Sequence, residues 1–320
     1  MKKQKIILNS IISFSLGIGL IYLVFRNIDF QSFFNKLDTI NYAWIYFSMF
    51  ISVLEHVIRG YRWNLLMESS KNKFSTFITT NVVIVSYFFA LFIPRFNDII
   101  RCYFISKTNK INVSTSLGTV FSERIFDVVS LLILTFFFLL IEFDIFYSFI
   151  NEYIISNISI DRYTLVFIII CIALLMFLLR YINLKSHYLG KKINEFKSGA
   201  LSIGKIYKNK NFIISTILLW CIYFLMGYVI FFSIPETSNL GLIAGLAVLV
   251  SGSLGMIVPV NAGIGAYHFL VASILIGYGI DYETGLFFAT ILHTSQIVCL
   301  ALLGLFSSII LFLKIRSNEK

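Results

Sequence analysis

Arginine and carboxylate side chains gather in three groups that lie beside or inside strongly apolar segments of this sequence. The groups occupy residues 55–62, 94–101 and 123–127. A charged side chain at membrane depth costs roughly 2.5 to 3.5 kcal/mol on insertion scales, so it usually has a charged partner or faces a water-filled path. The planar guanidinium group of arginine binds two oxygens of a phosphate or carboxylate at once. These groups are therefore the first candidates for a functional site.

The first group places three charges on one face of a predicted helix. Glu55, Arg59 and Arg62 stand at i, i+4 and i+7. Glutamate four residues before arginine is the favourable order for an ion pair on a helix. A polar, ligand-facing surface is one interpretation. The other is an anchor, in which Arg59, Arg62 and Trp63 reach the lipid headgroups at the end of a span.

The second group has the composition of a phosphate site. Pro94 suits the first turn of a helix, and Arg95, Asp98 and Arg101 follow it at intervals of three residues. Two guanidinium groups near a helix N-terminus favour a lipid phosphate as the ligand. The alternative is a basic loop that obeys the positive-inside rule.

The third group lies inside a spanning helix. Glu123 and Asp127 share a helix face, Arg124 is within reach of Asp127, and the apolar run continues to residue 141. We expect these carboxylates to pair with Arg95 or Arg101 from the neighbouring segment. A purely structural network of buried ion pairs is the alternative.

A glycine-rich segment at residues 251–268 predicts a broken helix. Proline and closely spaced glycines interrupt the apolar sequence and leave unwound backbone before a new helix begins, an arrangement that often lines a transport path. A tight turn between closely packed helices is the alternative. The candidate path-lining residues are Pro259, Asn261, Gly263, Gly265 and His268.

The elements that position these groups belong to a membrane protein. Of the 320 residues, 58% are hydrophobic and 13% are charged, too few polar groups to cover a water-soluble fold. The four cysteines are scattered and no histidine stands at metal-ligand spacing, so the sequence predicts neither a metal site nor a cofactor. It predicts no nucleic-acid partner, and it leaves homo-oligomerisation open.

Apolar stretches predict an all-α, polytopic membrane helix bundle with about eight transmembrane helices and re-entrant segments. The lysines near the N-terminus and between residues 180 and 210 both favour the cytoplasm, so an even number of crossings must separate them. Five stretches lie between these points, and we expect 77–93, which has basic flanks on both sides, to be re-entrant. The stretches are 6–25, 42–58, 77–93, 115–141, 163–181, 212–234, 240–260, 263–279 and 285–313.

The whole chain, 1–320, is expected to form one integral membrane domain. The charged groups fall in a first half, 1–183, and the glycine-rich turn falls in a second half, 212–320. A basic loop, 184–211, separates them on the cytoplasmic side. The protein is expected to be a multi-pass protein of the cell inner (cytoplasmic) membrane, with both termini in the cytoplasm.

The order and spacing of these motifs resemble the flippase-like transmembrane family named for lysylphosphatidylglycerol synthase. The resemblance rests on four motifs along most of the chain: Arg59-x-x-Arg62-Trp63, Pro94-Arg95-x-x-Asp98-x-x-Arg101, Glu123-Arg124-x-x-Asp127 and Pro259-x-x-x-Gly263-x-Gly265. It implies a multi-span bundle with re-entrant elements that moves lipids between leaflets. It also implies the translocating part alone, without an aminoacyl-transferase domain.

These observations lead to the hypothesis of a flippase-like lipid translocase rather than an enzyme. Arg95 and Arg101 would hold the lipid phosphate, while Glu123 and Asp127 would orient the arginines or meet a cationic headgroup. The expected partner is an anionic phospholipid or a polyprenyl-phosphate-linked sugar. Two alternatives remain: a membrane transferase that acts on a lipid-linked sugar, with a carboxylate as base, and a non-catalytic scaffold in the assembly of envelope glycolipids or polysaccharides.

Overall fold

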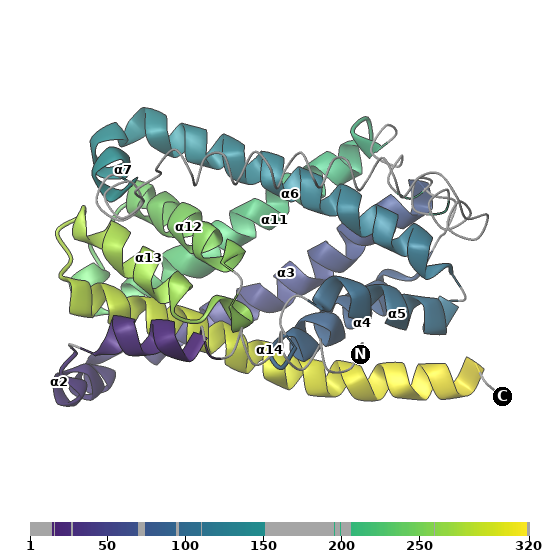
Figure 1. Cartoon of the computed structure of the whole chain (residues 1–320), viewed down its shortest axis with the longest axis horizontal. Helices are drawn as coiled ribbons and strands as arrows, with labels where there is room; N and C mark the ends of the chain where they lie inside the picture. The colour runs from purple at the N-terminus through teal and green to yellow at the C-terminus, as the bar shows by residue number, and fades with distance from the viewer. Residues whose placement is uncertain are drawn as a thin grey trace, which may run out of the picture.

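The computed structural model describes residues 15, 17–26, 28–69, 74–93, 96–109, 111–150, 195, 199, 206–258 and 260–318. Over these ranges the chain is helical, with no strand, so the protein is an all-α, polytopic membrane helix bundle as predicted (Figure 1). The helices are α2 (Phe30–Asn35), η1 (Lys36–Thr39), α3 (Tyr42–Ser69), α4 (Thr76–Ala90), α5 (Asn97–Asn109), α6 (Val113–Ile141), α7 (Phe143–Ile150), α11 (Lys210–Tyr228), η3 (Val229–Ser233), η4 (Pro235–Thr237), α12 (Leu242–Ile257), η5 (Asn261–Gly263), α13 (Ala266–Ile276) and α14 (Tyr282–Asn318).

Three helices among the described residues are long and apolar enough to cross a bilayer: Val113–Ile141, Lys210–Ser233 and Tyr282–Ser317. A fourth span results if α2 with η1 and α3, which are bent by 86° from each other, are counted together. The predicted stretch 163–181 and most of 6–25 lie outside the described residues. The expected total of about eight spans therefore stays a prediction.

The predicted re-entrant stretch corresponds to α4 and the turn that follows it. With 15 residues, α4 extends about 22 Å, less than the ~30 Å hydrocarbon core. It packs against α3 and α14 and is followed by α5, which packs beside it at the same end of the molecule (Figure 1). This length agrees with a re-entrant element, and the re-entrant position of α4 in the membrane stays a prediction.

A single glycine allows α3 and α4 to approach closely. A Cβ atom built at Gly60 would lie 2.7 Å from the Cα atom of Thr80 and 2.4 Å from its hydroxyl oxygen. Small residues permit this kind of backbone approach between membrane helices. Gly60 thereby brings the charged face of α3 next to α4.

The second half contains a pair of short helices joined at the predicted helix break. Helix α12 ends at Ile257 and α13 begins at Ala266, and the two helices pack against each other. Between them Ala262, Gly263 and Gly265 have φ values of 50°, 72° and 85°. Left-handed backbone of this kind suits glycine and is strained for alanine.

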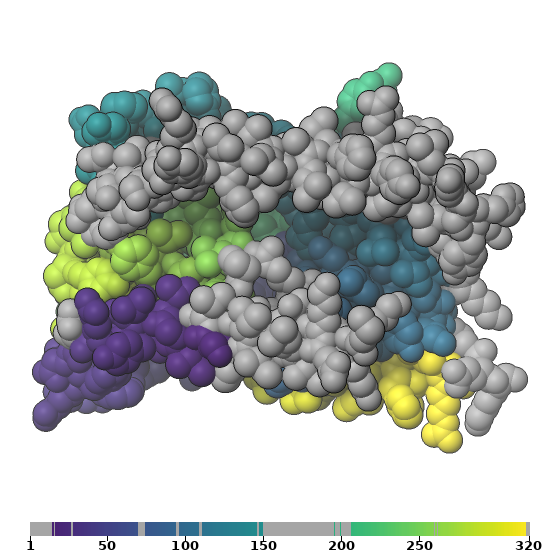
Figure 2. Space-filling view, in the orientation of Figure 1, coloured from purple at the N-terminus to yellow at the C-terminus, as the bar shows by residue number. Residues whose placement is uncertain are grey.

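Buried apolar side chains form two main clusters at opposite ends of the bundle. One includes Phe231 and Phe287, near the turn between η3 and α12, and the other includes Trp63, Leu66 and Val82 at the junction of α3 and α4. The outward faces of α6 and α14 carry many exposed apolar side chains, and part of α14, in yellow, is visible along the lower right edge of the space-filling view (Figure 2). The charged groups of the first half therefore lie beside the second apolar cluster.

Candidate functional site

Glu123 is the centre of the charged groups, and three arginines surround it. Its side chain is completely buried on α6. Arg101 Nη1 lies 3.0 Å from Glu123 Oε2, while Arg62 Nη2 and Arg59 Nη1 lie 3.3 Å and 3.6 Å from Oε1. Helices α3, α5 and α6 therefore meet at a single carboxylate.

Two aspartates extend this arrangement toward the surface. Asp127 Oδ1 lies 2.6 Å from Arg62 Nη2, and Asp127 Oδ2 lies 3.4 Å from Arg124 Nη1. Asp98 Oδ1 lies 2.8 Å from Arg124 Nη2 and 3.6 Å from Arg101 Nη2. Each aspartate thus bridges two arginines.

The ion pair predicted within α3 completes the group. Arg59 Nε lies 2.9 Å from Glu55 Oε1, as the i, i+4 spacing predicts. We call the four arginines and four carboxylates the charged cluster, and its formal charge is zero. Its members are Glu55, Arg59, Arg62, Asp98, Arg101, Glu123, Arg124 and Asp127.

Two tyrosines that the sequence analysis missed join further helices to the charged cluster. The Tyr87 hydroxyl on α4 accepts hydrogen bonds from Arg59 and from Arg124, the latter at 3.2 Å. The Tyr223 hydroxyl on α11 contacts Arg59 and donates to Glu55 Oε1 at 3.0 Å. A hydroxyl within an apolar helix was the available signal, but neither spacing nor charge marked these tyrosines.

Arg101 also packs on an aromatic ring. Its guanidinium carbon lies 4.5 Å from the centroid of the Trp63 ring, within the range of a cation–π interaction. Trp63 Nε1 in turn donates to Thr119 Oγ1 at 3.1 Å. Trp63 therefore fixes the position of an arginine instead of anchoring the chain at the membrane surface.

Among the described residues, two arginines of the charged cluster have donors without a hydrogen-bond partner. These are Nε and Nη1 of Arg62 and Nε and Nη2 of Arg101. Both side chains are almost completely buried, with exposed fractions of 0% and 1%. A buried, unpaired polar group typically costs about 1 to 3 kcal/mol, and more when the group is charged. The described contacts of the two residues therefore leave part of this cost uncompensated.

The charged cluster reaches the surface at one edge. The side chains of Asp98 and Arg124 are about one third exposed, at 31% and 35%. Asp98 lies on α5, outside the long apolar helices. Burial alone would raise the pKa of its carboxyl. The positive charges of Arg101 and Arg124 outweigh that effect and hold the pKa below its ordinary value. Asp98 and Arg124 are therefore the most exposed members of the charged cluster.

The structure brings together the predicted charged residues that it describes. Arg59 and Arg62 are buried, so the membrane-anchor interpretation of the first group is wrong. Arg101 pairs with Glu123, as expected for neighbouring segments. Pro94 and Arg95 lie outside the described residues, and α5 begins at Asn97.

The glycine-rich turn lies apart from the charged cluster, and no described hydrogen bond or ion pair joins them. His268 Nδ1 accepts a hydrogen bond from the backbone N–H of Gly265 at 3.3 Å. The ring of His268 lies 5.0 Å from that of His293. Pro259 and the side chain of Asn261 lie outside the described residues. His268 thus accepts a hydrogen bond from the backbone of the turn itself. The predicted role of the turn in a transport path stays a prediction.

Comparison with known proteins supplies an independent result. The family model described as lysylphosphatidylglycerol synthase TM region matches residues 8–304. The UPF0104 membrane protein MJ1078 of Methanocaldococcus jannaschii is 28% identical over 233 residues, which cover 71% of this chain and 96% of the relative. No solved structure matches the chain.

Proposed function

Since this chain belongs to the family of the lysylphosphatidylglycerol synthase transmembrane region, we propose that it is a lipid translocase that binds a lipid phosphate at the charged cluster. The observation that carries the proposal is the pair of buried arginines with unused donors, Arg62 and Arg101. Phosphate oxygens accept charge-assisted hydrogen bonds from guanidinium groups, frequently two at a time. A lipid phosphate would therefore satisfy donors that have no hydrogen-bond partner among the described residues.

Binding requires an exchange of partners. The arginines already face Glu123 and Asp127, so an incoming phosphate competes with these carboxylates for the same guanidinium groups. The exposed edge formed by Asp98 and Arg124 is where the phosphate would enter, and Arg124, which pairs with Asp98 and Asp127 at once, would give up one of these contacts to bind it. When the phosphate leaves, Glu123 and Asp127 pair with the arginines again, so the arginines always have a counter-charge. This competition also weakens the binding of the lipid enough for its release.

The same proposal assigns an orientation of the protein in the membrane. The basic residues of the N-terminus and of the 180–210 region favour the cytoplasm, and the charged cluster would then lie toward the cytoplasmic side of the inner membrane. The cargo would be an anionic phospholipid or a polyprenyl-phosphate-linked sugar taken from the cytoplasmic leaflet.

A purely structural role for the charged cluster is the second candidate. Its formal charges balance, and most of its members are buried, as in an ion-pair network that only joins helices. A transferase has less support, because each carboxylate of the charged cluster faces an arginine and is poorly placed to act as a base. An activity measurement separates the translocase from the structural network.

The test is lipid movement in proteoliposomes. Purified protein is reconstituted with a fluorescent phospholipid, and a membrane-impermeant quencher reports the fraction that has changed leaflet. We expect faster exchange than in empty vesicles, and a loss of that exchange in Arg101→Gln. The matched control is Arg316→Gln, which removes an exposed arginine at the end of α14.

Three outcomes are decisive. Exchange at the empty-vesicle rate with phospholipids and with lipid-linked sugars rejects the translocase. Normal exchange in a folded Arg101→Gln protein rejects the charged cluster as the binding site. Equal loss in both arginine variants would assign the effect to overall charge.

A further inference from the structure

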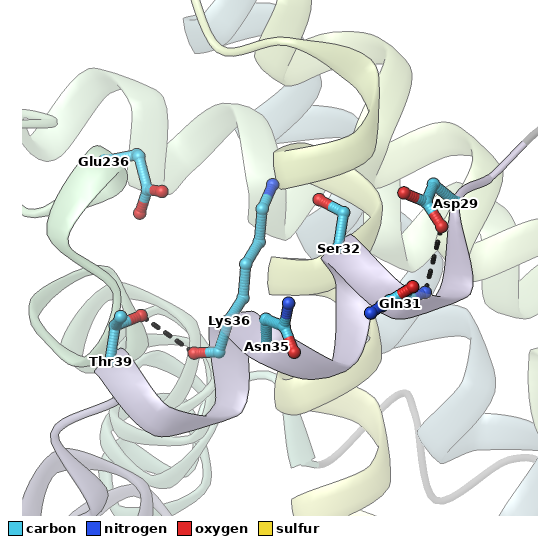
Figure 3. Close-up of a pocket in the computed structure, with 7 residues that line it drawn as sticks. All are labelled: Asp29, Gln31, Ser32, Asn35, Lys36, Thr39 and Glu236. Carbon is cyan, nitrogen blue, oxygen red and sulfur yellow. Dashed lines mark hydrogen bonds between the residues drawn. The ribbon is translucent and has the colours of Figure 1, made fainter.

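A second polar site lies at the other end of the molecule. It is a surface pocket of about 450 Å³ (Figure 3). The short helices α2 and η1 form one wall, and the turn containing η4 forms the other. Its lining residues are Asp29, Gln31, Ser32, Asn35, Lys36, Thr39 and Glu236.

Helical spacing places three kinds of side chain on three different faces of α2 and η1. Phe30 and Phe34, one turn apart, are 52% and 59% exposed on the outside of the molecule. Gln31 and Asn35 repeat the same spacing and line the pocket. Residues four apart lie on one helix face, so a lipid-facing stripe runs beside a polar one.

The third group of side chains, Ser32 and Lys36, joins the pocket wall to α14 by polar contacts. Ser32 Oγ donates to Glu283 Oε1 at 3.0 Å. Lys36 Nζ donates to Thr284 Oγ1 at 2.8 Å and lies 3.6 Å from Glu283 Oε1. The wall is therefore held in place, although α2 and η1 are short.

The remaining groups of the pocket have hydrogen-bonding capacity to spare. Asp29 uses Oδ1 to accept the backbone N–H of Gln31, which leaves its other oxygen available. Among the described contacts, none involves the side-chain amides of Gln31 and Asn35 or the carboxylate of Glu236. Amides supply both donors and acceptors, and carboxylates supply acceptors.

The charges of the pocket disfavour a small ion of either sign. Figure 3 shows the Lys36 side chain reaching between Glu236 and Ser32, with Asp29 at the far edge. An anion would face the carboxylates of Asp29 and Glu236, and a cation would face the ammonium group of Lys36. A neutral group with many hydroxyls can donate to the carboxylates and accept from the amides and the lysine at the same time.

The position of the pocket suits a lipid headgroup. From the start of α3 to Arg62 the helix advances about 30 Å, close to the thickness of a hydrocarbon core. Figure 1 accordingly shows α2 at the opposite end of the bundle from α5. Measured along α3, the pocket end of the bundle therefore lies about 20 Å from Glu55 and about 30 Å from Arg62 of the charged cluster. Phe30 and Phe34 stand beside the pocket, where acyl chains would be.

We propose that the pocket between α2 and Glu236 binds the hydroxyl-rich headgroup of a lipid, a sugar or a glycerol, on the membrane face opposite the charged cluster. This inference rests on the proposed function in taking a membrane lipid as the ligand. A translocated lipid would leave the arginines and meet a second, weaker site before it joins the other leaflet.

Binding to nanodiscs tests the proposal without requiring transport. The purified protein is placed in phosphatidylcholine nanodiscs that contain a few per cent of a glycosyl diacylglycerol, of phosphatidylglycerol or of neither, and the lipids retained after detergent extraction are identified by native mass spectrometry. We expect retention of the glycosyl lipid, of phosphatidylglycerol or of both, with a fall of at least about fivefold in Asn35→Leu and in Glu236→Gln. Asp38→Asn is the control, because Asp38 is an exposed carboxylate of η1 that does not line the pocket.

The two lipids distinguish the two sources of hydroxyls. Retention of the glycosyl lipid alone assigns the pocket to a sugar, and retention of phosphatidylglycerol alone assigns it to a glycerol. Unchanged retention in both pocket variants, or retention of a choline lipid only, overturns the proposal.

The Arg101→Gln variant, compared with the pocket variants in both assays, distinguishes a failure of the pocket proposal from a failure of the translocase proposal. If the pocket variants lose retention while proteoliposomes show no lipid exchange, the pocket stands and the translocase fails. If exchange depends on Arg101 but retention does not depend on Asn35 or Glu236, the translocase stands and the pocket fails.

Discussion

Arg101 Nη1 lies 3.0 Å from Oε2 of the fully buried Glu123, so a residue of the short polar helix α5 neutralises a carboxylate inside the spanning helix α6. A buried charge without enough counter-charge costs several kcal/mol, so each partner stabilises the other in its buried position. The pair therefore fixes α5 against α6, and it also keeps an arginine with unused donors inside the bundle. Structure and proposed binding depend on the same contact.

Glu123→Gln should destabilise the protein strongly. The substitution keeps the size of the side chain but removes the negative charge that Arg59, Arg62 and Arg101 share. Breaking a buried ion pair from one side typically costs about 3 to 5 kcal/mol. We expect a large fall in the unfolding temperature, measured by the fluorescence of a purified sample in detergent.

A second substitution separates charge from packing in the same pair. If the cost arises from an uncompensated arginine, adding Arg101→Gln to Glu123→Gln should cost less than the two single effects combined. Simple additivity of the two single effects would contradict a direct interaction between these residues.

Arg62→Lys should reduce lipid exchange while preserving the fold. Lysine keeps the positive charge near Asp127 but lacks the planar fork that binds two phosphate oxygens. Losing one or two charge-assisted hydrogen bonds corresponds to a fall of about tenfold or more in the exchange rate. The rate is measured in the proteoliposomes described above, with circular dichroism and gel filtration as checks of folding. A folded Arg62→Lys protein with the wild-type rate would show that charge alone is sufficient at this position.

The sequence could predict those contacts that helical spacing determines. Glu55 with Arg59 and Arg124 with Asp127 follow from intervals of four and three residues, and both pairs form. The proximity of Arg101 to Glu123 followed from the need of a buried carboxylate for a partner.

Other contacts depend on how distant helices cross, which spacing does not determine. Arg62 meets Asp127 across 65 residues, and Tyr223 meets Glu55 across 168. The bend of 86° that turns α2 away from α3 and creates one wall of the pocket also had no signal in the apolar pattern. Tertiary packing decided these features.

His268→Leu should loosen the glycine-rich turn. His268 is the third residue of α13, and its Nδ1 accepts the backbone N–H of Gly265 at the N-cap. Without that acceptor, we expect a loss of about 1 kcal/mol in stability, the usual cost of losing a cap. Glutamate and glutamine are the usual residues at this position of a capping box, so His268→Gln should retain most of the stability. Thermal unfolding of the two variants checks the prediction, and equal losses in both would assign the effect to packing around the histidine ring.

Gly60→Ala should separate α3 from α4 and disturb the charged cluster indirectly. The added methyl group would lie 2.7 Å from the Cα atom of Thr80, a backbone atom that no rotation of a side chain can move away. The helices must therefore shift, and the contact of Tyr87 on α4 with Arg59 on α3 should weaken.

We expect the Gly60→Ala protein to be destabilised by about 1 to 3 kcal/mol, as in other overpacked sites, with slower lipid exchange. Gly19→Ala is the matched control, because a methyl group there meets nothing within 4 Å. Combining Gly60→Ala with Thr80→Ala distinguishes a clash with the backbone from a clash with the hydroxyl, which would lie 2.4 Å from the new methyl group. Since the backbone clash persists in the double variant, recovery of wild-type stability there would contradict the close helix approach as the cause.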